Sequence, residues 1–175
     1  MKKIIFILFV GLLFISCRKN TEKAYLFEME YPVDFTINAG IGPFVTHYFD
    51  IQALPTFSDS LFAYHHVDPA TIESILPRKG RMEAIFDDVE YDFIKSIEVE
   101  FFNAENGQIV GTIVPAFYRD PVPNKTGRVV DLVSEEADLK QFLLKDKMNV
   151  RIKLKLFGAS PKTIESRLIL KFAVR

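Results

Sequence analysis

The sequence predicts an all-β protein: an antiparallel β-sandwich of immunoglobulin-like architecture with two short helical connectors. Three observations lead to this prediction. Several stretches alternate apolar and polar side chains, which is the period of a strand with one buried face. Turn residues, including an Asn-Gly pair, separate these stretches. Helical periodicity is confined to two short segments.

The first residues predict a secretory signal. Lys2 and Lys3 form a positive segment, and residues 4–15 form an apolar run that is too short to span a bilayer as a mature helix. The run ends in Leu-Phe-Ile-Ser before Cys17, the only cysteine of the chain. This segment resembles the lipobox of bacterial lipoproteins. A plain secreted protein and an uncleaved anchor are the alternatives.

The resemblance implies that residues 1–16 are removed as a signal peptide and that the Cys17 thiol carries acyl chains such as palmitate. Residues 17–24 would then form a lipidated tether, and residues 25–175 the sandwich domain. Each buried CH₂ contributes about 0.8 kcal/mol, so two or three acyl chains hold a protein on a membrane. The expected location is therefore the cell envelope, on the periplasmic face or at the cell surface.

Composition restricts the possible functions. Without Lys2 and Lys3, 20 basic side chains remain against 23 acidic ones, so nothing indicates a nucleic-acid-binding protein. The length beyond the tether suits one domain with one core. If Cys17 is lipidated, no thiol is left for a disulfide, a thiolate metal ligand or a nucleophile.

The first strands are predicted from alternation. Residues 27–38 place apolar side chains on one face, and Pro32 predicts a sheet edge or a bend because proline cannot donate to a ladder. Residues 39–43 form a turn, and residues 44–53 form a second strand in which His47 is half-buried.

The next segment predicts the first helical connector. Residues 57–67 are ambiguous, but Asp68 and Pro69 suit an N-cap and a first helical position. Ile72, Ile75 and Leu76 form its apolar stripe, and residues 78–81 form a turn after it.

The middle of the chain predicts strands at residues 81–87, 93–102, 108–117 and 128–133. Asn106 and Gly107 predict a tight hairpin between the second and third of these. Residues 120–127 form a loop by composition. Ser134 then caps the second helical connector, in which Leu139, Phe142 and Leu143 form the apolar stripe.

Residues 150–156 and 164–174 predict a final hairpin, with Leu154 and Leu170 on its buried face. Its outward side chains are basic, whereas those of residues 27–38 and 93–102 are acidic. Two arrangements remain open. Either acidic and basic strands are neighbours and pair across the ladder, or the basic hairpin is unpaired and faces anionic headgroups. We expect pairing.

The candidate metal ligands are His65, His66, His47 and Asp50, whose side chains zinc accepts. Adjacent residues of an extended segment point to opposite faces, so His65 and His66 would not chelate together. We therefore predict no metal site and no cofactor.

Catalytic motifs are weak. Asp87, Asp88 and Glu90 can supply paired carboxylates for glycoside hydrolysis, but acidic clusters in turns are more often solvated loops. No Gly-x-Ser-x-Gly nucleophile turn and no phosphate-binding loop is present. The sequence therefore predicts no catalytic residue.

A binding module is the favoured class, since sandwiches present loops at each end. Phe57, Phe62, Tyr64 and Tyr118 are the loop aromatics that can stack on a ligand or cover the ends of the core. We expect a lipid-anchored, non-catalytic binding or assembly protein whose partner is the membrane, through Cys17, and an envelope protein or glycan. The alternative is an envelope hydrolase or carbohydrate-binding protein that uses loop carboxylates, His or aromatics.

Overall fold

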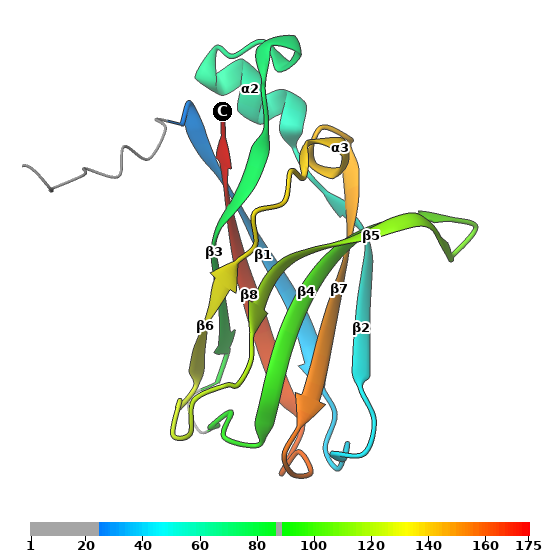
Figure 1. The fold of residues 1–175 in the computed structure, drawn as a ribbon, viewed down its shortest axis with the longest axis vertical. Coiled ribbons are helices and arrows are strands. Elements are labelled where there is room, and N and C mark those ends of the chain that lie inside the picture. The colour runs from blue at the N-terminus through cyan, green and yellow to red at the C-terminus, as the bar shows by residue number, and fades with distance from the viewer. Residues whose placement is uncertain (1–24, 87–88) are drawn as a thin grey trace, which may run out of the picture.

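Eight antiparallel strands dominate the computed structural model, which describes residues 25–86 and 89–175 (Figure 1). The strands are β1 (Phe27–Ile37), β2 (His47–Pro55), β3 (Ile75–Ala84), β4 (Ile94–Glu105), β5 (Gln108–Arg119), β6 (Val129–Ser134), β7 (Lys147–Leu156) and β8 (Ile164–Val174). The all-β, antiparallel prediction is confirmed. The predictions for residues 1–24, Cys17 included, lie outside the described residues.

The strands follow the order β1-β8-β3-β6-β5-β4-β7-β2. Two four-strand halves, β1-β8-β3-β6 and β5-β4-β7-β2, are joined through two residue pairs between β5 and β6. The sheet folds over, so that the halves face one another across the core (Figure 1). The pairs β1–β8, β2–β7, β3–β6 and β4–β5 are nested, which is the order of a jelly roll, a fold between a sandwich and a barrel.

This order differs from the immunoglobulin-like topology that we expected. In immunoglobulin domains the first two strands are neighbours, and so are the last two. Here β1 and β2 lie at the two ends of the order, and β7 and β8 lie in different halves. Pro32 is thus on an edge strand, as predicted.

The predicted final hairpin is therefore wrong, although both of its strands exist. β7 pairs with β2 and β4, whereas β8 pairs with β1 and β3. A hairpin that paired Leu156 with Ile164 would place Lys153 opposite Arg167, and like charges directly opposite destabilise a ladder. In the observed order Lys153 pairs with Glu98 and Arg167 with Asp34.

Ion pairs join outward side chains of neighbouring strands. Basic side chains of β7 and β8 are therefore paired with acidic ones, as expected. The ion pairs are Arg167–Asp34 at 2.7 Å, Lys171–Glu30 at 2.6 Å, Lys171–Glu28 at 3.2 Å, Arg151–Asp50 at 2.6 Å, Lys153–Glu98 at 2.6 Å, Lys153–Glu100 at 3.0 Å and Arg81–Asp131 at 2.9 Å. The hydrogen-bonded Arg167 guanidinium holds the pKa of Asp34 below its usual range.

Side chains close the gap between the two sheet edges. The Tyr31 hydroxyl on β1 donates a 2.7 Å hydrogen bond to the carbonyl of Thr56, just after β2. Further along, the rings of Phe35 and Phe49 lie 5.3 Å apart. Thr56 is fully buried, and its hydroxyl donates to the carbonyl of Lys145. The edges therefore meet through packing and side-chain hydrogen bonds.

The helical connectors differ from those predicted. The ambiguous residues 57–67 contain α2 (Ser58–His65), and Asp68 caps only the 3₁₀ turn η2 (Pro69–Thr71), accepting a 2.9 Å hydrogen bond from the Ala70 amide. The second connector, α3 (Lys140–Leu143), is present, but Ser134 belongs to β6. Asp138 instead accepts from the Lys140 amide at 3.0 Å.

The predicted helix at residues 69–76 and the turn at residues 78–81 are wrong because β3 begins at Ile75 and runs through both. Ile75 is fully buried and pairs with Val174, so a tertiary partner overrides the local pattern. The ladder shifts register between Pro77 and Lys79, which accommodates the proline. Gly80 lies within the strand, where a Cβ would come within 2.9 Å of the Phe117 ring.

β2 begins later than predicted. The expected strand covered residues 44–53, but the ladder with β7 starts at His47. Phe44 and Val45 lie in the preceding loop, at 97% and 62% exposed. His47 is half-buried, as expected.

We predict that Leu170→Ala lowers the free energy of unfolding by about 2–5 kcal/mol, because Leu170 is fully buried in β8 and the substitution leaves a cavity. Leu154→Ala in β7 should act similarly, since Leu154 is also fully buried. The control is Lys153→Ala, which removes partly exposed ion pairs and should cost less. Denaturant melts measure all three, and a costlier Lys153→Ala would contradict the assignment of faces.

We also predict that stability falls above about pH 10, the ordinary pKa of tyrosine. Burial, aided by the charge of Glu83, raises the pKa of Tyr91 to about 12 despite the hydrogen bond to Ser166. Between about pH 10 and about pH 12 the unfolded chain loses a proton that the folded protein keeps, so the free energy of unfolding decreases as pH rises. Tyr91→Phe should flatten this decrease in melts at pH 9–11, and an equally steep decrease in that variant would contradict the prediction.

Candidate functional site

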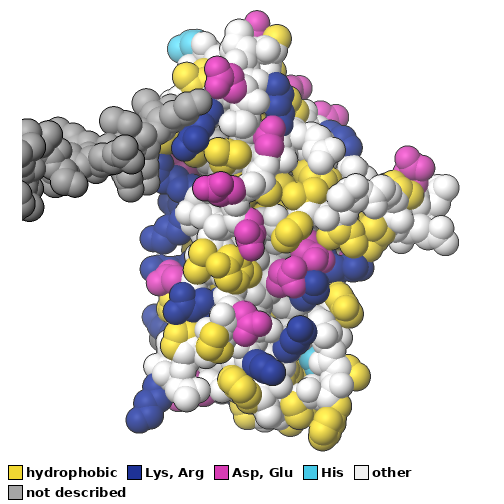
Figure 2. All heavy atoms as spheres, viewed as in Figure 1, with side chains coloured by type: hydrophobic (Ala, Val, Ile, Leu, Met, Phe, Trp, Pro, Cys, Tyr) yellow, Lys and Arg dark blue, Asp and Glu magenta, His cyan; other side chains and the backbone are white. Residues whose placement is uncertain are grey.

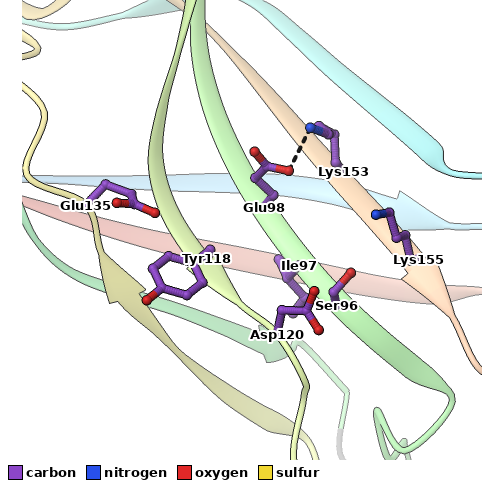
Figure 3. A pocket seen from close by; sticks show the side chains of 8 residues that line it. All are labelled: Ser96, Ile97, Glu98, Tyr118, Asp120, Glu135, Lys153 and Lys155. Carbon is purple, nitrogen blue, oxygen red and sulfur yellow. Dashed lines mark ion pairs between the residues drawn. The ribbon is translucent and has the colours of Figure 1, made fainter.

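A polar hollow of about 240 Å³ lies on the outer face of β4, β5 and β7 (Figure 3). Its walls come from three strands and from two segments that come directly after strands. In Figure 3 Glu135 and Tyr118 lie on one side, Lys153 and Lys155 lie on the other, and Asp120 lies between them beside Ser96. We call this feature the side hollow.

Strand register builds the side hollow. In β4 the alternation turns Ile97 and Val99 into the core and Glu98 outward. Glu98 pairs with Tyr118 of β5 on one side and with Lys153 of β7 on the other. One row across three strands therefore presents a ring, a carboxylate and an ammonium group.

The remaining walls come from a register shift and from strand ends. The β4–β7 ladder shifts between Ile94 and Ser96, at the floor of the hollow. Asp120 lies just past the end of β5, and Glu135 just past the end of β6. The Glu135 amide donates a 2.8 Å hydrogen bond to the carbonyl of Ala116, which holds this segment against β5.

Lys153 forms ion pairs with two carboxylates on this face. Its Nζ lies 2.6 Å from a Glu98 oxygen and 3.0 Å from a Glu100 oxygen. Burial opposes the charge, but the hydrogen bonds to both carboxylates prevail and raise the pKa of Lys153. The ammonium group is therefore a fixed positive charge, already shared between two acids.

Other groups of the side hollow have unused hydrogen-bonding capacity. Five groups of the lining have no side-chain hydrogen bond and no ion pair among residues 25–86 and 89–175. They are the hydroxyls of Ser96 and Tyr118, the carboxylates of Asp120 and Glu135, and the ammonium group of Lys155. Ser96 is 8% exposed and Tyr118 is 37% exposed. Both donors and acceptors are thus available to a ligand.

A second hollow, of about 580 Å³, adjoins the first at Glu135, which lines both. It lies against the start of β3 and the end of β8, with Pro77, Arg78 and Arg175 in its walls. Arg78 lies 3.5 Å from a Glu28 oxygen, whereas the buried Nε of Arg175 has no hydrogen-bond partner among the described residues.

The histidines singled out in the sequence do not meet. His65 lies in α2 and stacks on the Phe27 ring at 4.2 Å, while His66 ends that helix. The Nε2 of His47 lies 2.7 Å from the carbonyl oxygen of Gly42, and Asp50 pairs with Arg151. Within the part of the chain that the structure describes, no three His, Cys, Asp or Glu side chains form a group suited to a metal ion.

The carboxylates considered for glycoside hydrolysis are not all placed. Asp87 and Asp88 lie outside the described residues, and Glu90 is exposed in the loop between β3 and β4. The loop at residues 120–127 is present as predicted, with Val122 buried and its amide bonded to the Lys95 carbonyl at 2.8 Å.

The four aromatics singled out fall into three groups. Phe62 is buried and packs edge-on against Phe27 at 5.5 Å, so it covers the end of the core. Phe57 and Tyr64 are exposed beside and on α2. Tyr118 belongs to β5, not to a loop, and lines the side hollow.

Sequence reasoning missed a second surface, at the end of the fold where β1, β3, β5 and β7 finish (Figure 1). Phe44, Val45, Phe86 and Phe157 lie in its loops and are 97%, 62%, 65% and 54% exposed. We call these four residues the loop-end surface, and Figure 2 shows hydrophobic side chains gathered at this lower end. The signal that could have revealed it is the Gly-Pro-Phe-Val run just before β2.

Backbone hydrogen bonds tie these loops together. Gly40 and Ile41, before Phe44, bond with Ser160 of the β7–β8 loop at 2.9 Å in both directions. The Phe157 amide donates to the Phe93 carbonyl at 2.8 Å. The aromatic side chains therefore project from loops that are held in place.

No protein-family model matches this chain, and a search of curated proteins finds no match. Among the described helices, none has the length and apolar character needed to cross a membrane.

Proposed function

We propose that this chain is a lipid-anchored protein of the cell envelope, held through Cys17, that binds a partner protein with its loop-end surface. The observation that carries this proposal is the exposure of large apolar side chains on bonded loops at one end of the domain. Exposed apolar patches on folded proteins mark interaction sites. The role is binding or assembly, and it requires no catalytic residue.

The place where the described chain enters the domain supports the proposal. The described chain enters at Tyr25, just before β1, and the loop that carries Phe44 comes after β1. At about 3.3 Å per residue, the 11 residues of β1 separate these two points by roughly 33 Å. A lipid on Cys17 would leave the loop-end surface available away from the anchor.

Charge favours a protein over a membrane as the occupant. A membrane-inserting tip surrounds its apolar residues with cations, which attract anionic headgroups. The loops at this end carry both signs, with Lys125 exposed alongside Glu90 and Asp92. A mixed polar rim around an apolar centre is typical of protein interfaces.

Lipidation is the first test. Wild-type protein should incorporate a labelled fatty acid and fractionate with membranes, and Cys17→Ala should lose both because the acylated thiol is absent. Thr21→Ser, in the tether after this segment, serves as the control because it leaves both the lipobox-like residues and the thiol unchanged. An unlabelled wild-type protein would contradict the anchoring.

The loop-end surface is the second test. A photo-crosslinking phenylalanine analogue in place of Phe44 should yield one discrete protein adduct in cells, and the same analogue in place of Tyr64, exposed at the opposite end, should not. Adding Phe157→Ser should weaken the adduct at position 44, since it removes a second exposed apolar side chain of the loop-end surface. Equal adducts at both positions would show nonspecific contact and contradict the proposal.

A further inference from the structure

We propose that the side hollow is a binding site for an uncharged oligosaccharide. This site lies on the strand face of β4, β5 and β7, apart from the loop-end surface, so it is independent of the partner protein proposed above. Four properties of the hollow support this ligand class: its mixed donors and acceptors, its balance of charge, its exposed ring and its extension past Glu135.

The free polar groups of the side hollow complement hydroxyl groups. The carboxylates of Asp120 and Glu135 only accept hydrogen bonds, whereas the Lys155 ammonium group only donates them. The hydroxyls of Ser96 and Tyr118 can do both. A sugar hydroxyl also donates and accepts, so one saccharide ring can hydrogen bond to a donor and to a neighbouring acceptor at the same time. A ligand that only accepts hydrogen bonds would leave Asp120 and Glu135 unsatisfied, and a ligand that only donates them would leave Lys155 unsatisfied.

The charge of the hollow disfavours ionic ligands. Glu98 shares Lys153 with Glu100, so Asp120, Glu135 and Lys155 are the remaining charged residues of the lining. A phosphate or carboxylate ligand would meet two carboxylates for each free ammonium group. A metal ion would meet Lys153 and Lys155 as well as the acids. An uncharged ligand with many hydroxyls meets neither penalty.

Tyr118 supplies the apolar contact that saccharide binding needs. The residue is 37% exposed, lines the hollow and occupies the same row as Glu98 and Lys153. One face of a pyranose ring is apolar, and an exposed aromatic ring offers a flat surface for it while the hydroxyl remains solvated or bonded. The ring therefore orients the sugar whose edges the polar groups bind.

The ligand is longer than one sugar unit. Glu135 lines both the side hollow and the larger hollow beside β3 and β8. The second hollow is lined by Arg78 and Arg175, whose guanidinium groups donate hydrogen bonds and accept none. A chain of sugar units that passes Glu135 would reach donors and acceptors in both hollows.

Calorimetric titration of the full-length protein tests this proposal. The protein is kept in a zwitterionic detergent, because glycoside detergents would compete. The ligands are cellotetraose, mannotetraose and the β-1,4-linked tetramer of N-acetylglucosamine, each compared with its monosaccharide. We expect at least one tetramer to bind, and to bind at least tenfold more tightly than its monosaccharide.

Two variants of the hollow locate the binding. Tyr118→Ala and Glu135→Gln should each weaken tetramer binding at least tenfold, and Glu135 is an outward residue whose substitution leaves the core intact. Tyr64→Ala is the matched control, since it removes an exposed tyrosine on α2 outside both hollows. Absence of binding by all three tetramers overturns the proposal, and so does unchanged affinity in Glu135→Gln. Neither result bears on the photo-crosslink at position 44, which tests the loop-end surface separately.

Discussion

The packing of Phe172 between the two halves of the sheet is the contact on which the fold depends. Two residue pairs form the backbone link between the halves, so hydrogen bonds alone cannot hold them face to face. The ring of Phe172 in β8 meets the rings of Phe101 and Phe117 in the other half edge-on, with ring centroids 5.7 Å apart in each pair. Within its own half, it lies 5.9 Å from the ring of Tyr31. Burial of these rings, at roughly 25 cal/mol per Å² of apolar surface, supplies the attraction that backbone pairing lacks. Because the inward faces of the strands are buried in this packing, a ligand or partner can contact only the outward faces and the loops.

Charge on the outward faces then selects which strands become neighbours. The acidic positions of β1, β2 and β4 face the basic positions of β7 and β8 at the paired registers. Each exposed pair contributes little, but the alternative hairpin of β7 with β8 would replace attraction by repulsion at Lys153 and Arg167. Arg151, Lys153, Arg167 and Lys171 all form ion pairs in this arrangement. Lys155, which lines the side hollow, has no ion pair among the described residues.

Local pattern predicts strands well here and partners poorly. Alternation located β1, β4, β5, β7 and β8, and Asn106 with Gly107 located the β4–β5 hairpin, because these signals are contained within a few residues. The start of β3 was predicted as helix because Asp68 and Pro69 do form a cap, whereas the pairing of Ile75 with Val174, a residue far along the chain, makes the next segment a strand.

The side hollow was missed for the same reason. The aromatic character of Tyr118 is evident from the sequence, but its meeting with Glu98, Lys153 and Glu135 depends on the register of two ladders and on the segment after β6.

The jelly-roll order also separates the proposed tasks in space. Loops that come after β1, β3, β5 and β7 must emerge at one end, while the chain enters β1 at the other, beside α2 (Figure 1). An anchor before β1 and a partner at the loop-end surface therefore do not compete for area. The side hollow lies along the strands between these ends, where Tyr118 and Glu98 are held by the ladders that build the core. A ligand bound there would rest on rigid strands, so its binding requires little ordering of the protein. The proposed anchor, partner and saccharide therefore occupy separate places on one small domain.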